Sequence, residues 1–173
     1  GIIAGQGTVG LELMHQANAL SMVPDQVLIC CGGGGLSSGS AIAVKDAAPD
    51  AEVYLVEPVD FDDTKRSFEA GIRLGNDPSA RSICDALQTE TPGAMTFDIN
   101  KSLAKGVLTV TDEEVREAMR FAFRHLKLVV EPGGSVALAA LLASKLNCKE
   151  QTTAIVISGG NVDEKLFADI QSS

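Results

Sequence analysis

Four consecutive glycines are the strongest chemical feature of the sequence. Gly32–Gly35 follow the apolar stretch 27–31 and precede Ser37 and Ser38, which are good N-caps for a helix. A plain turn does not need four glycines, because each one costs backbone entropy. Four bare residues leave backbone N–H groups open to a tetrahedral oxyanion, and the positive end of the following helix adds to that field. The run therefore predicts a phosphate cradle, with a flexible or tightly packed turn as the alternative.

A second cluster, Ser158-Gly159-Gly160-Asn161, follows the apolar stretch 153–157. Alone it is weak evidence, because Ser158 could cap the end of a strand as readily as it could touch a ligand. Ligands of parallel α/β sheets bind at the carboxyl ends of the strands. Because both glycine clusters follow apolar stretches, we expect both to lie at such ends.

Residues 5–10 read Gly-Gln-Gly-Thr-Val-Gly and match the GxGxxG dinucleotide fingerprint by letter. That motif needs a full strand before it and an acidic residue about twenty positions later, closing a βαβ unit. Only the Ile-Ile-Ala of residues 2–4 is available as the strand, and Asp25 stands before the next strand rather than at its end. We interpret the motif as a tight strand-to-helix turn with close packing.

An acidic loop offers oxygen ligands. Asp60, Asp62 and Asp63 follow Glu57 within a few positions. Clustered carboxylates suit Mg²⁺ or Ca²⁺. From the local sequence alone, a solvated loop is the better interpretation.

The cysteines predict reduced thiols rather than disulfides or a zinc site. Cys30, Cys31, Cys84 and Cys148 form no CxxC pair and no Cys/His array with zinc spacing. Cys30 and Cys31 are neighbours in an apolar strand, so their side chains should point to opposite faces. Such cysteine usage indicates a reducing, cytoplasmic compartment.

Composition excludes several classes of partner. The chain has 23 acidic against 14 basic residues, a net charge of -9, so a nucleic acid is not expected. The longest apolar helical stretch, 136–143, is far too short to cross a bilayer, and no secretory signal is present. We therefore expect neither a nucleic-acid nor a membrane partner.

Strand and helix patterns alternate along the chain and must position these residues. They predict an α/β fold in which a mostly parallel sheet is covered by helices on both faces, as one domain over residues 1–173. The predicted strands are 27–31, 52–57, 106–110 and 153–157. The predicted helices are 9–19, one from Ser37 or Ser38 to about 48, 64–70, 112 to about 127, 135–146, and one from about 162.

Three local features complete this outline. Thr111 and Glu114 form a capping box at the start of the helix at 112. The stretch 71–105 has weak periodicity, so we expect irregular structure with short helical pieces. The chain opens on Gly1-Ile2-Ile3 as if inside a strand, which we interpret as a fragment of a longer protein.

Taken together, these segments resemble the serine/threonine dehydratase and serine racemase branch of the fold-type II pyridoxal-phosphate enzymes. The resemblance covers nearly the whole chain in family order and corresponds to the C-terminal half of such an enzyme. It implies a truncated three-layer large domain of the tryptophan synthase β-like type. It rests on Gly5-Gln6-Gly7-Thr8, Gly32 to Leu36, Val56-Glu57-Pro58, Asp62-Asp63, Glu131-Pro132-Gly133-Gly134 and Ser158-Gly159-Gly160-Asn161-Val162-Asp163.

The resemblance assigns roles to these positions. It implies that pyridoxal 5'-phosphate is bound, with its phosphate on Gly32, Gly33, Gly34, Gly35 and the Leu36 amide. It implies that Ser158 forms a hydrogen bond with the pyridine nitrogen and that Gly159 lies beside it in the same site. It reverses the interpretation of the acidic loop: Glu57, Asp63 and the Phe61 carbonyl match a site for Mg²⁺ or Ca²⁺. Glu131 matches a glutamate near the cofactor, with a buried structural acid paired with backbone as the competing interpretation.

The family's Schiff-base lysine is not matched in this sequence. In relatives it lies in a Ser-Phe-Lys-type motif of the first half, and none of the eight lysines here matches that position. A nucleophilic amine must be partly desolvated and held against the carbonyl. We therefore expect this polypeptide to be inactive without the N-terminal half of its parent, which the resemblance implies is a homodimer.

For the parent, the resemblance implies a dehydratase that converts L-threonine or L-serine to a 2-oxo acid and ammonia. Serine racemase and 3-hydroxyaspartate dehydratase remain alternatives, because they differ mainly in residues of the missing half. A non-catalytic domain that binds a phosphate ligand is the alternative from another class. A purely structural α/β domain leaves the four glycines unexplained.

Overall fold

The computed structural model describes residues 1–172 and has a four-stranded parallel sheet in the order β3-β2-β1-β4. The strands are β1 (Gln26–Cys30), β2 (Glu52–Pro58), β3 (Gly106–Val110) and β4 (Thr153–Ile155). Val27 of β1 lies between Val53 of β2 and Ala154 of β4. Every residue of β1 is buried, as expected for a central strand covered on both faces. The predicted parallel sheet is confirmed.

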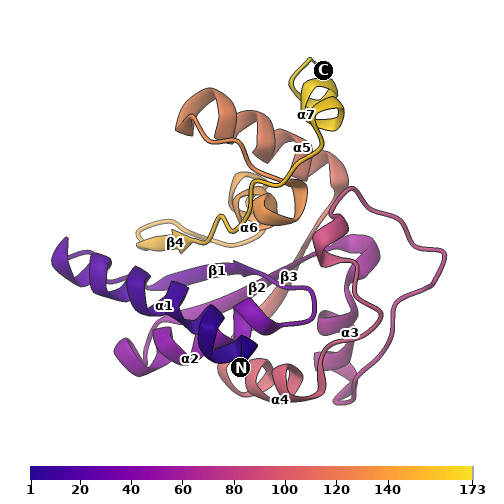
Figure 1. Ribbon diagram of the computed structural model, residues 1–173. Helices are drawn as coiled ribbons and strands as arrows, with labels where there is room; N and C mark the ends of the chain where they lie inside the picture. Colours follow the sequence, from indigo (N-terminus) through magenta and orange to yellow (C-terminus); the bar gives the residue numbers. More distant parts are fainter. Residues whose placement is uncertain (173) are drawn as a thin grey trace.

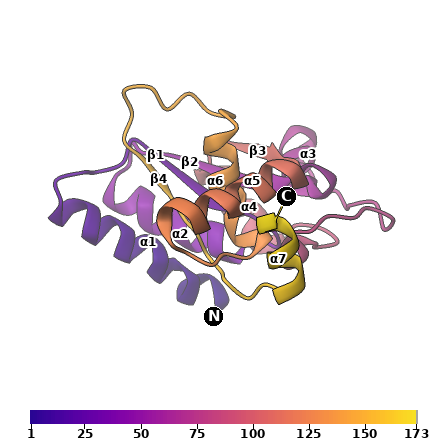
Figure 2. The ribbon, with the colours of Figure 1, turned by 90° about the horizontal axis from the view of Figure 1, so that it is seen from above.

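Helices cover both faces of this sheet. Figure 1 shows the helices above and below the strands, and Figure 2 shows the same ribbon from above. One face carries α1 (Ile2–Ala19), α2 (Gly35–Ala47) and α4 (Ala94–Leu103), and the other carries α5 (Asp112–Phe121), α6 (Pro132–Leu142) and α7 (Glu164–Ser172). Adjacent strand residues serve different cores: Ile29 packs toward α1 and α2, whereas Leu28 packs toward α5 and α6. The α/β fold with three layers is therefore confirmed.

The amino-terminal segment is helical, so the predicted strand at residues 2–4 and the turn at 5–10 are wrong. Helix α1 runs without a break from Ile2. Gly7 and Gly10 are buried against α2, and a Cβ at Gly10 would come within 2.7 Å of the Ser40 carbonyl oxygen. A glycine costs a helix about 1 kcal/mol. We attribute the glycines to this close approach to α2, which confirms the close packing predicted for the motif.

Helix α2 also begins differently from the prediction. Its N-cap is Gly34, in the left-handed region at φ 85°, rather than Ser37 or Ser38. Both serines lie within the first turn, where their hydroxyls donate back to the carbonyls of Gly34 and Gly35 at 3.3 Å each. The serine caps were wrong because the backbone turns at a glycine, the residue that adopts this conformation without strain.

Between β2 and α5 the chain forms the 3₁₀ turns η1 (Val59–Phe61) and η2 (Asp85–Leu87), and helices α3 (Asp63–Ala70) and α4. The ten residues of α4 exceed the short helical pieces predicted for 71–105. Its periodicity is weak because only Phe97 and Asn100 of the helix are buried.

The capping box at Thr111 is confirmed: the Glu114 N–H donates to Thr111 Oγ1 at 3.2 Å, and the Thr111 N–H donates to Glu114 Oε2 at 2.8 Å. The α-helix ends at Phe121, earlier than predicted, and continues as the π-helix η3 (Ala122–Leu126). At Lys127 the backbone turns to φ 60° and leaves the helix. Within residues 1–172, no helix has the length and apolar character needed to cross a membrane.

Candidate functional site

A cavity of about 570 Å³ lies at the carboxyl edge of the sheet, beside the ends of β1 and β4. The connection from β1 leads to β2 on one side, whereas β4 flanks β1 on the other, so the strand order reverses here. Such a reversal is where open α/β sheets bind ligands. The size also matches that of small-molecule sites. The lining comes from five parts of the chain: Gln6 and Val9; Cys30 and Gly32–Leu36; Ala86 and Leu87; Glu131 and Gly133; and Val156–Ser158.

The tetraglycine loop forms one wall of this cavity, as its sequence predicted. Gly34 is required by the chain itself, because its φ is 85° and a Cβ there would lie 2.8 Å from Thr96. Gly33 is different: the nearest atom to a Cβ would be Thr89 Cγ2 at 3.7 Å, an ordinary contact. Packing within the chain therefore does not explain the glycine at position 33. A ligand that approaches the bare backbone would explain it.

Helix α2 adds a favourable field for an anion at this wall. The Ser38 N–H is the donor to the Gly34 carbonyl, at 2.9 Å, so the N–H groups before it precede the helical hydrogen-bond ladder. These donors and the positive end of the 13-residue helix meet at the glycine loop. The loop can therefore accept a phosphate-sized oxyanion.

The cavity lining also contains a hydrogen-bonded pair, Ser158 and Cys30. Ser158 Oγ lies 3.2 Å from Cys30 Sγ. Burial raises the pKa of Cys30, and the Glu131 charge adds to this effect against the opposing Ser158 hydrogen bond. The thiol therefore stays protonated at neutral pH. Its S–H can donate to Ser158 Oγ, which leaves the Ser158 proton for a ligand in the cavity.

Glu131 lines the same cavity and braces the turn that carries Ser158. Its backbone N–H donates to the Gly159 carbonyl at 3.0 Å, and its Oε2 accepts from the Asn161 N–H at 2.9 Å. A Cβ at Gly159 would collide with the Glu131 carboxylate. Gly159 thus lies behind Ser158 rather than in the lining, and Glu131 fits the structural interpretation while also facing the cavity.

Some lining residues were missed or set aside in the sequence. Cys30, Ala86 and Leu87 lie in the cavity wall, although none of them was predicted to contact a ligand. The Cys30–Ser158 pair joins residues 128 positions apart. A contact of that kind leaves no local signal in a single sequence.

The acidic residues differ in burial: two are buried, Asp62 is partly buried and Asp60 is exposed. Glu57 and Asp63 are fully buried, whereas Asp60 is exposed. The Glu57 carboxylate accepts the N–H groups of Thr64 and Lys65 at 3.1 Å each, at the first turn of α3. Burial first, and then the neighbouring Asp63 charge, raise the pKa of Glu57 to about 8.

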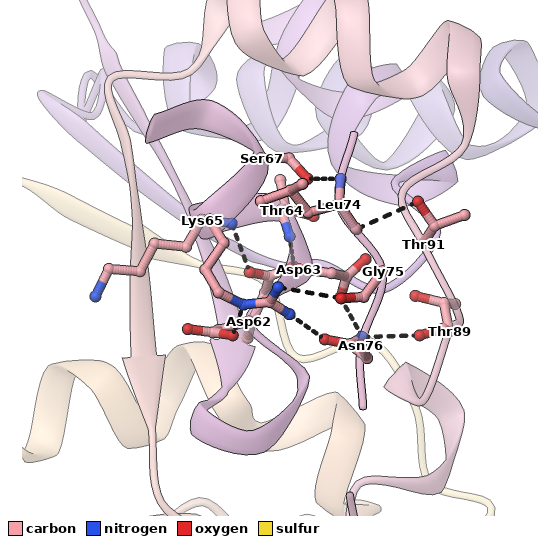
Figure 3. Close-up of polar contacts among 12 residues, drawn as sticks. Asp62, Asp63, Thr64, Lys65, Ser67, Leu74, Gly75, Asn76, Thr89 and Thr91 are labelled. Atoms are coloured by element: carbon pink, nitrogen blue, oxygen red, sulfur yellow. Dashed lines mark hydrogen bonds and ion pairs between the residues drawn. The ribbon is translucent and has the colours of Figure 1, made fainter. Parts of the chain in front are cut away.

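A polar network surrounds Asp63, and Figure 3 shows it. Asp63 Oδ1 accepts from Asn76 Nδ2 at 2.7 Å, and the same amide donates to the Thr89 carbonyl at 2.8 Å. Asn76 Oδ1 accepts from Arg66 at 2.7 Å. Asp63 Oδ2 is buried and has no hydrogen-bond partner among the described residues. Burial raises the pKa of Asp63. This carboxylate oxygen is therefore held ready for another donor or a cation.

Phe61, the third predicted metal ligand, ends the turn η1 between Glu57 and Asp63 and is buried. Within residues 1–172 no group of three or more His, Cys, Asp or Glu side chains gathers in a way that could hold a metal. The predicted site at Glu57, Asp63 and the Phe61 carbonyl has only two side-chain carboxylates, and a cation in it stays a prediction.

The lysines lie elsewhere. Of the described residues that line the cavity, none is a lysine. Lys105 pairs with Glu52 and Lys145 with Glu114, while Lys45 and Lys127 donate to the carbonyls of Pro49 and Arg124. These four lysines therefore form ion pairs or backbone hydrogen bonds away from the cavity.

Comparison with known proteins points to one group. A family model described as pyridoxal-phosphate dependent enzyme matches residues 1–159. The chain is 41% identical to the serine racemase of Schizosaccharomyces pombe over 171 residues, which cover 99% of this chain and 51% of that protein. It is 39% identical to an L-threo-3-hydroxyaspartate ammonia-lyase of Pseudomonas sp, with 98% of this chain and 51% of that protein covered.

The crystal structure of a T.th. threonine deaminase is similar to this one. The TM-score is 0.88 at 45% sequence identity, and the match covers 93% of this chain and 57% of that one. The chain thus spans about half the length of the curated relatives that it matches.

Proposed function

The chain belongs to the family of pyridoxal-phosphate dependent enzymes, and from this premise we propose that its cavity is the main part of the cofactor site in a hydroxy-amino-acid lyase. We further propose that the parent converts L-threonine or L-serine to a 2-oxo acid and ammonia. The observation that carries the proposal is the meeting of an open tetraglycine loop with Ser158 in one cavity of about 570 Å³.

The residues present fit this cofactor. The phosphate would lie on the N–H groups of Gly32–Gly35 and Leu36, where the amino end of α2 supplies positive potential. The space for a Cβ at Gly33 supports an approach of the ligand to bare backbone at that point. Ser158 would donate its proton to the pyridine nitrogen, with Cys30 holding the hydroxyl from behind.

A neutral hydroxyl at the ring nitrogen suits this class of reaction. When bound, the cofactor supplies an electron sink for the bond that breaks at the substrate's α-carbon. A serine, in place of a carboxylate, would leave the ring nitrogen without a full positive charge and so moderate that sink. Moderate withdrawal suits loss of the α-proton and the β-hydroxyl, after which hydrolysis releases the 2-oxo acid and ammonia.

We propose that the amine which attaches the cofactor comes from residues outside these 173. The absence of lysine among the described residues of the cavity lining supports this, as does the half-length match to the relatives. The missing half would also bind most of the substrate carboxylate. The polypeptide alone would therefore bind the cofactor without turning over an amino acid.

Serine racemase and 3-hydroxyaspartate dehydratase activities are second candidates, because relatives with these names are 41% and 39% identical to the chain, compared with 35% for an L-threonine ammonia-lyase. An assay of the full-length protein separates them: keto acid from L-threonine or L-serine supports the dehydratase, whereas D-serine from L-serine without keto acid supports the racemase. Keto acid from 3-hydroxyaspartate but not from threonine supports the third.

The buried pair Glu57 and Asp63, with the Phe61 carbonyl, would bind Mg²⁺ or Ca²⁺ near the cofactor cavity. The unpartnered Asp63 Oδ2 supports this, because a buried carboxylate oxygen without a donor is costly unless a cation neutralises it. Cation binding would displace the proton that the raised pKa leaves on Glu57, so that both carboxylates supply charge, and water would complete the coordination.

We also propose a cellular compartment and an oligomeric state for the full-length protein. Its four free thiols support a reducing compartment such as the cytoplasm. The full-length enzyme would form a homodimer, as implied by the family resemblance.

A further inference from the structure

Helix α4 contacts the tetraglycine loop through Thr96 but contributes no described residue to the lining of the cavity that contains Ser158. Thr96 Oγ1 lies 2.6 Å from the Gly33 carbonyl oxygen and 3.1 Å from that of Gly93. A hydroxyl has one proton to donate, and the shorter distance assigns it to Gly33. The Gly93 N–H reaches the same carbonyl more weakly, at 3.4 Å. The Gly33 carbonyl is therefore tied toward α4.

This tie fixes the direction of the next N–H. In a planar trans peptide the C=O and N–H point to opposite sides, so the Gly33–Gly34 unit directs its N–H away from α4. Thr96, with Met95 and Ile99, lines an apolar groove on one side of the loop. Of the described residues that line the cavity with Ser158, none comes from α4. The Gly34 N–H is thus turned to the cavity side.

A second tie reaches the following carbonyl. Asn100 of α4 is buried, and its Nδ2 donates to Ser37 Oγ at 2.9 Å. Ser37 Oγ in turn lies 3.3 Å from the Gly34 carbonyl oxygen and 3.5 Å from Cys31 Sγ, and it can donate its single proton to either. A Cβ on Gly34 would lie 2.8 Å from Thr96 and 3.0 Å from Asn100, so the loop is seated directly against these two side chains.

We propose that Thr96 is a positioning residue for the phosphate end of the cofactor site. Its hydroxyl holds the Gly33–Gly34 peptide with the N–H directed at the phosphate, and Asn100 supports the same loop through Ser37. The nature of the ligand rests on the proposed function, but the restraint on the peptide does not. Thr96 acts through the loop, because it is absent from the cavity lining.

The test compares Thr96→Val, which keeps the shape and removes the hydroxyl, with Thr96→Ser, which keeps the hydroxyl. Ser102→Ala is the matched control, since Ser102 lies on the same helix and its hydroxyl also donates to a backbone carbonyl, that of Ile99 at 2.8 Å. The first measurement is the ¹⁵N relaxation order parameter of the Gly33, Gly34 and Gly35 amides in the 173-residue chain. The second is the dissociation constant for added pyridoxal phosphate, with every variant held well below its unfolding temperature.

In Thr96→Val we expect the loop order parameters to fall from about 0.85 to below about 0.6, and those of α4 to stay high. Pyridoxal phosphate binding should weaken about tenfold, as for one misdirected hydrogen bond to a charged group. Thr96→Ser and Ser102→Ala should match the wild type in both measurements.

Unchanged loop order parameters in Thr96→Val would overturn the proposal, and so would a loosened loop with unchanged affinity. Failure of Thr96→Ser to restore the wild-type values would exclude the hydroxyl as the cause. If the wild type binds no pyridoxal phosphate, the proposed function fails. The order parameters then still decide whether Thr96 holds the peptide.

Discussion

Gly33 and Gly34 are adjacent, yet the chain's own packing requires a glycine only at Gly34. The left-handed backbone at Gly34 and its contact with Thr96 leave no room for a side chain. At Gly33 a methyl group would make an ordinary contact with Thr89. Substitution of Gly34 should therefore test the stability of the fold, and substitution of Gly33 should test ligand binding.

We predict that Gly33→Ala keeps the free energy of unfolding, or raises it by up to about 1 kcal/mol, because the unfolded chain loses freedom. The same change should weaken pyridoxal phosphate binding at least about tenfold, by obstructing the approach to the backbone. Gly34→Ala should lower the free energy of unfolding by about 2 kcal/mol or more. Denaturant unfolding and cofactor titration measure both. Equal affinities of Gly33→Ala and wild type would refute the assigned phosphate position.

The sequence predicted these site residues to different degrees. Gly32–Gly35 and Ser158 were found because their types and their place after apolar strands are local signals. The partners that orient them were not found, because Thr96 lies 63 positions from Gly33 and Cys30 lies 128 positions from Ser158. Only the fold brings such pairs together.

At the scale of elements, local hydrogen bonding was predicted better than helix–helix packing. The capping box depends on Thr111 and Glu114, which are only three positions apart in the sequence, and its prediction is confirmed. The glycines at 5–10 suggested a turn. In the structure, Gly7 and Gly10 instead leave room for the backbone of α2, which crosses close to α1. A single sequence cannot show which neighbour a small residue will meet.

The first turn of α3 carries the proposed cation site, and we predict that Mg²⁺ or Ca²⁺ raises the thermal midpoint of the chain. A concentration roughly a hundredfold above the dissociation constant should raise it by roughly 5–10 °C. Asp63→Asn should abolish this rise, because it removes the charge of the unpartnered buried oxygen. Asp60→Asn changes an exposed acid close by and should keep it. A full rise in Asp63→Asn, or none in the wild type, would contradict the site.

Tyr54, near the start of β2, is predicted to titrate at an unusually high pH. Tyr54 donates to Glu52 Oε2 at 2.7 Å, and burial, followed by this hydrogen bond, raises the pKa of Tyr54 to about 12. It is the sole tyrosine, so absorbance at alkaline pH reports it alone. Because the folded pKa exceeds the unfolded value of about 10, the stabilisation is complete below about pH 10 and is lost as the pH rises through about 12.

Glu52→Gln should move this titration midpoint toward about 10, with circular dichroism used to confirm that both proteins are still folded. A midpoint near 10 in the folded wild type would show that the Tyr54 environment described above is wrong.

Across the whole molecule, the reactivity of the four cysteine thiols depends on how well both faces of the sheet are packed. Cys30, Cys31 and Cys84 are buried, and burial raises the pKa of all three, that of Cys84 to about 12. Cys148 is only partly buried. At pH 8 we predict that a disulfide reagent modifies one thiol quickly and the other three only slowly until a denaturant is added. Cys148→Ser should remove the fast phase, and more than one fast thiol would contradict the packing.

We propose that this chain supplies the phosphate and ring contacts of the cofactor site and that residues outside it supply the amine, and the half-length match to the relatives supports this division. The order of the family motifs and the unmatched Schiff-base lysine led to this prediction from the sequence, and it stays a prediction. Which hydroxy-amino acid the parent takes was not predictable, because the residues that choose it lie outside this chain in our proposal.

A pyridoxal phosphate titration of the 173-residue chain, followed by borohydride reduction and peptide mapping, tests whether the chain binds the cofactor without a lysine of its own. We predict saturable binding without one-to-one labelling of any single lysine. Stoichiometric labelling of one lysine, lost under competing phosphate, would place the catalytic amine inside these residues and contradict the account.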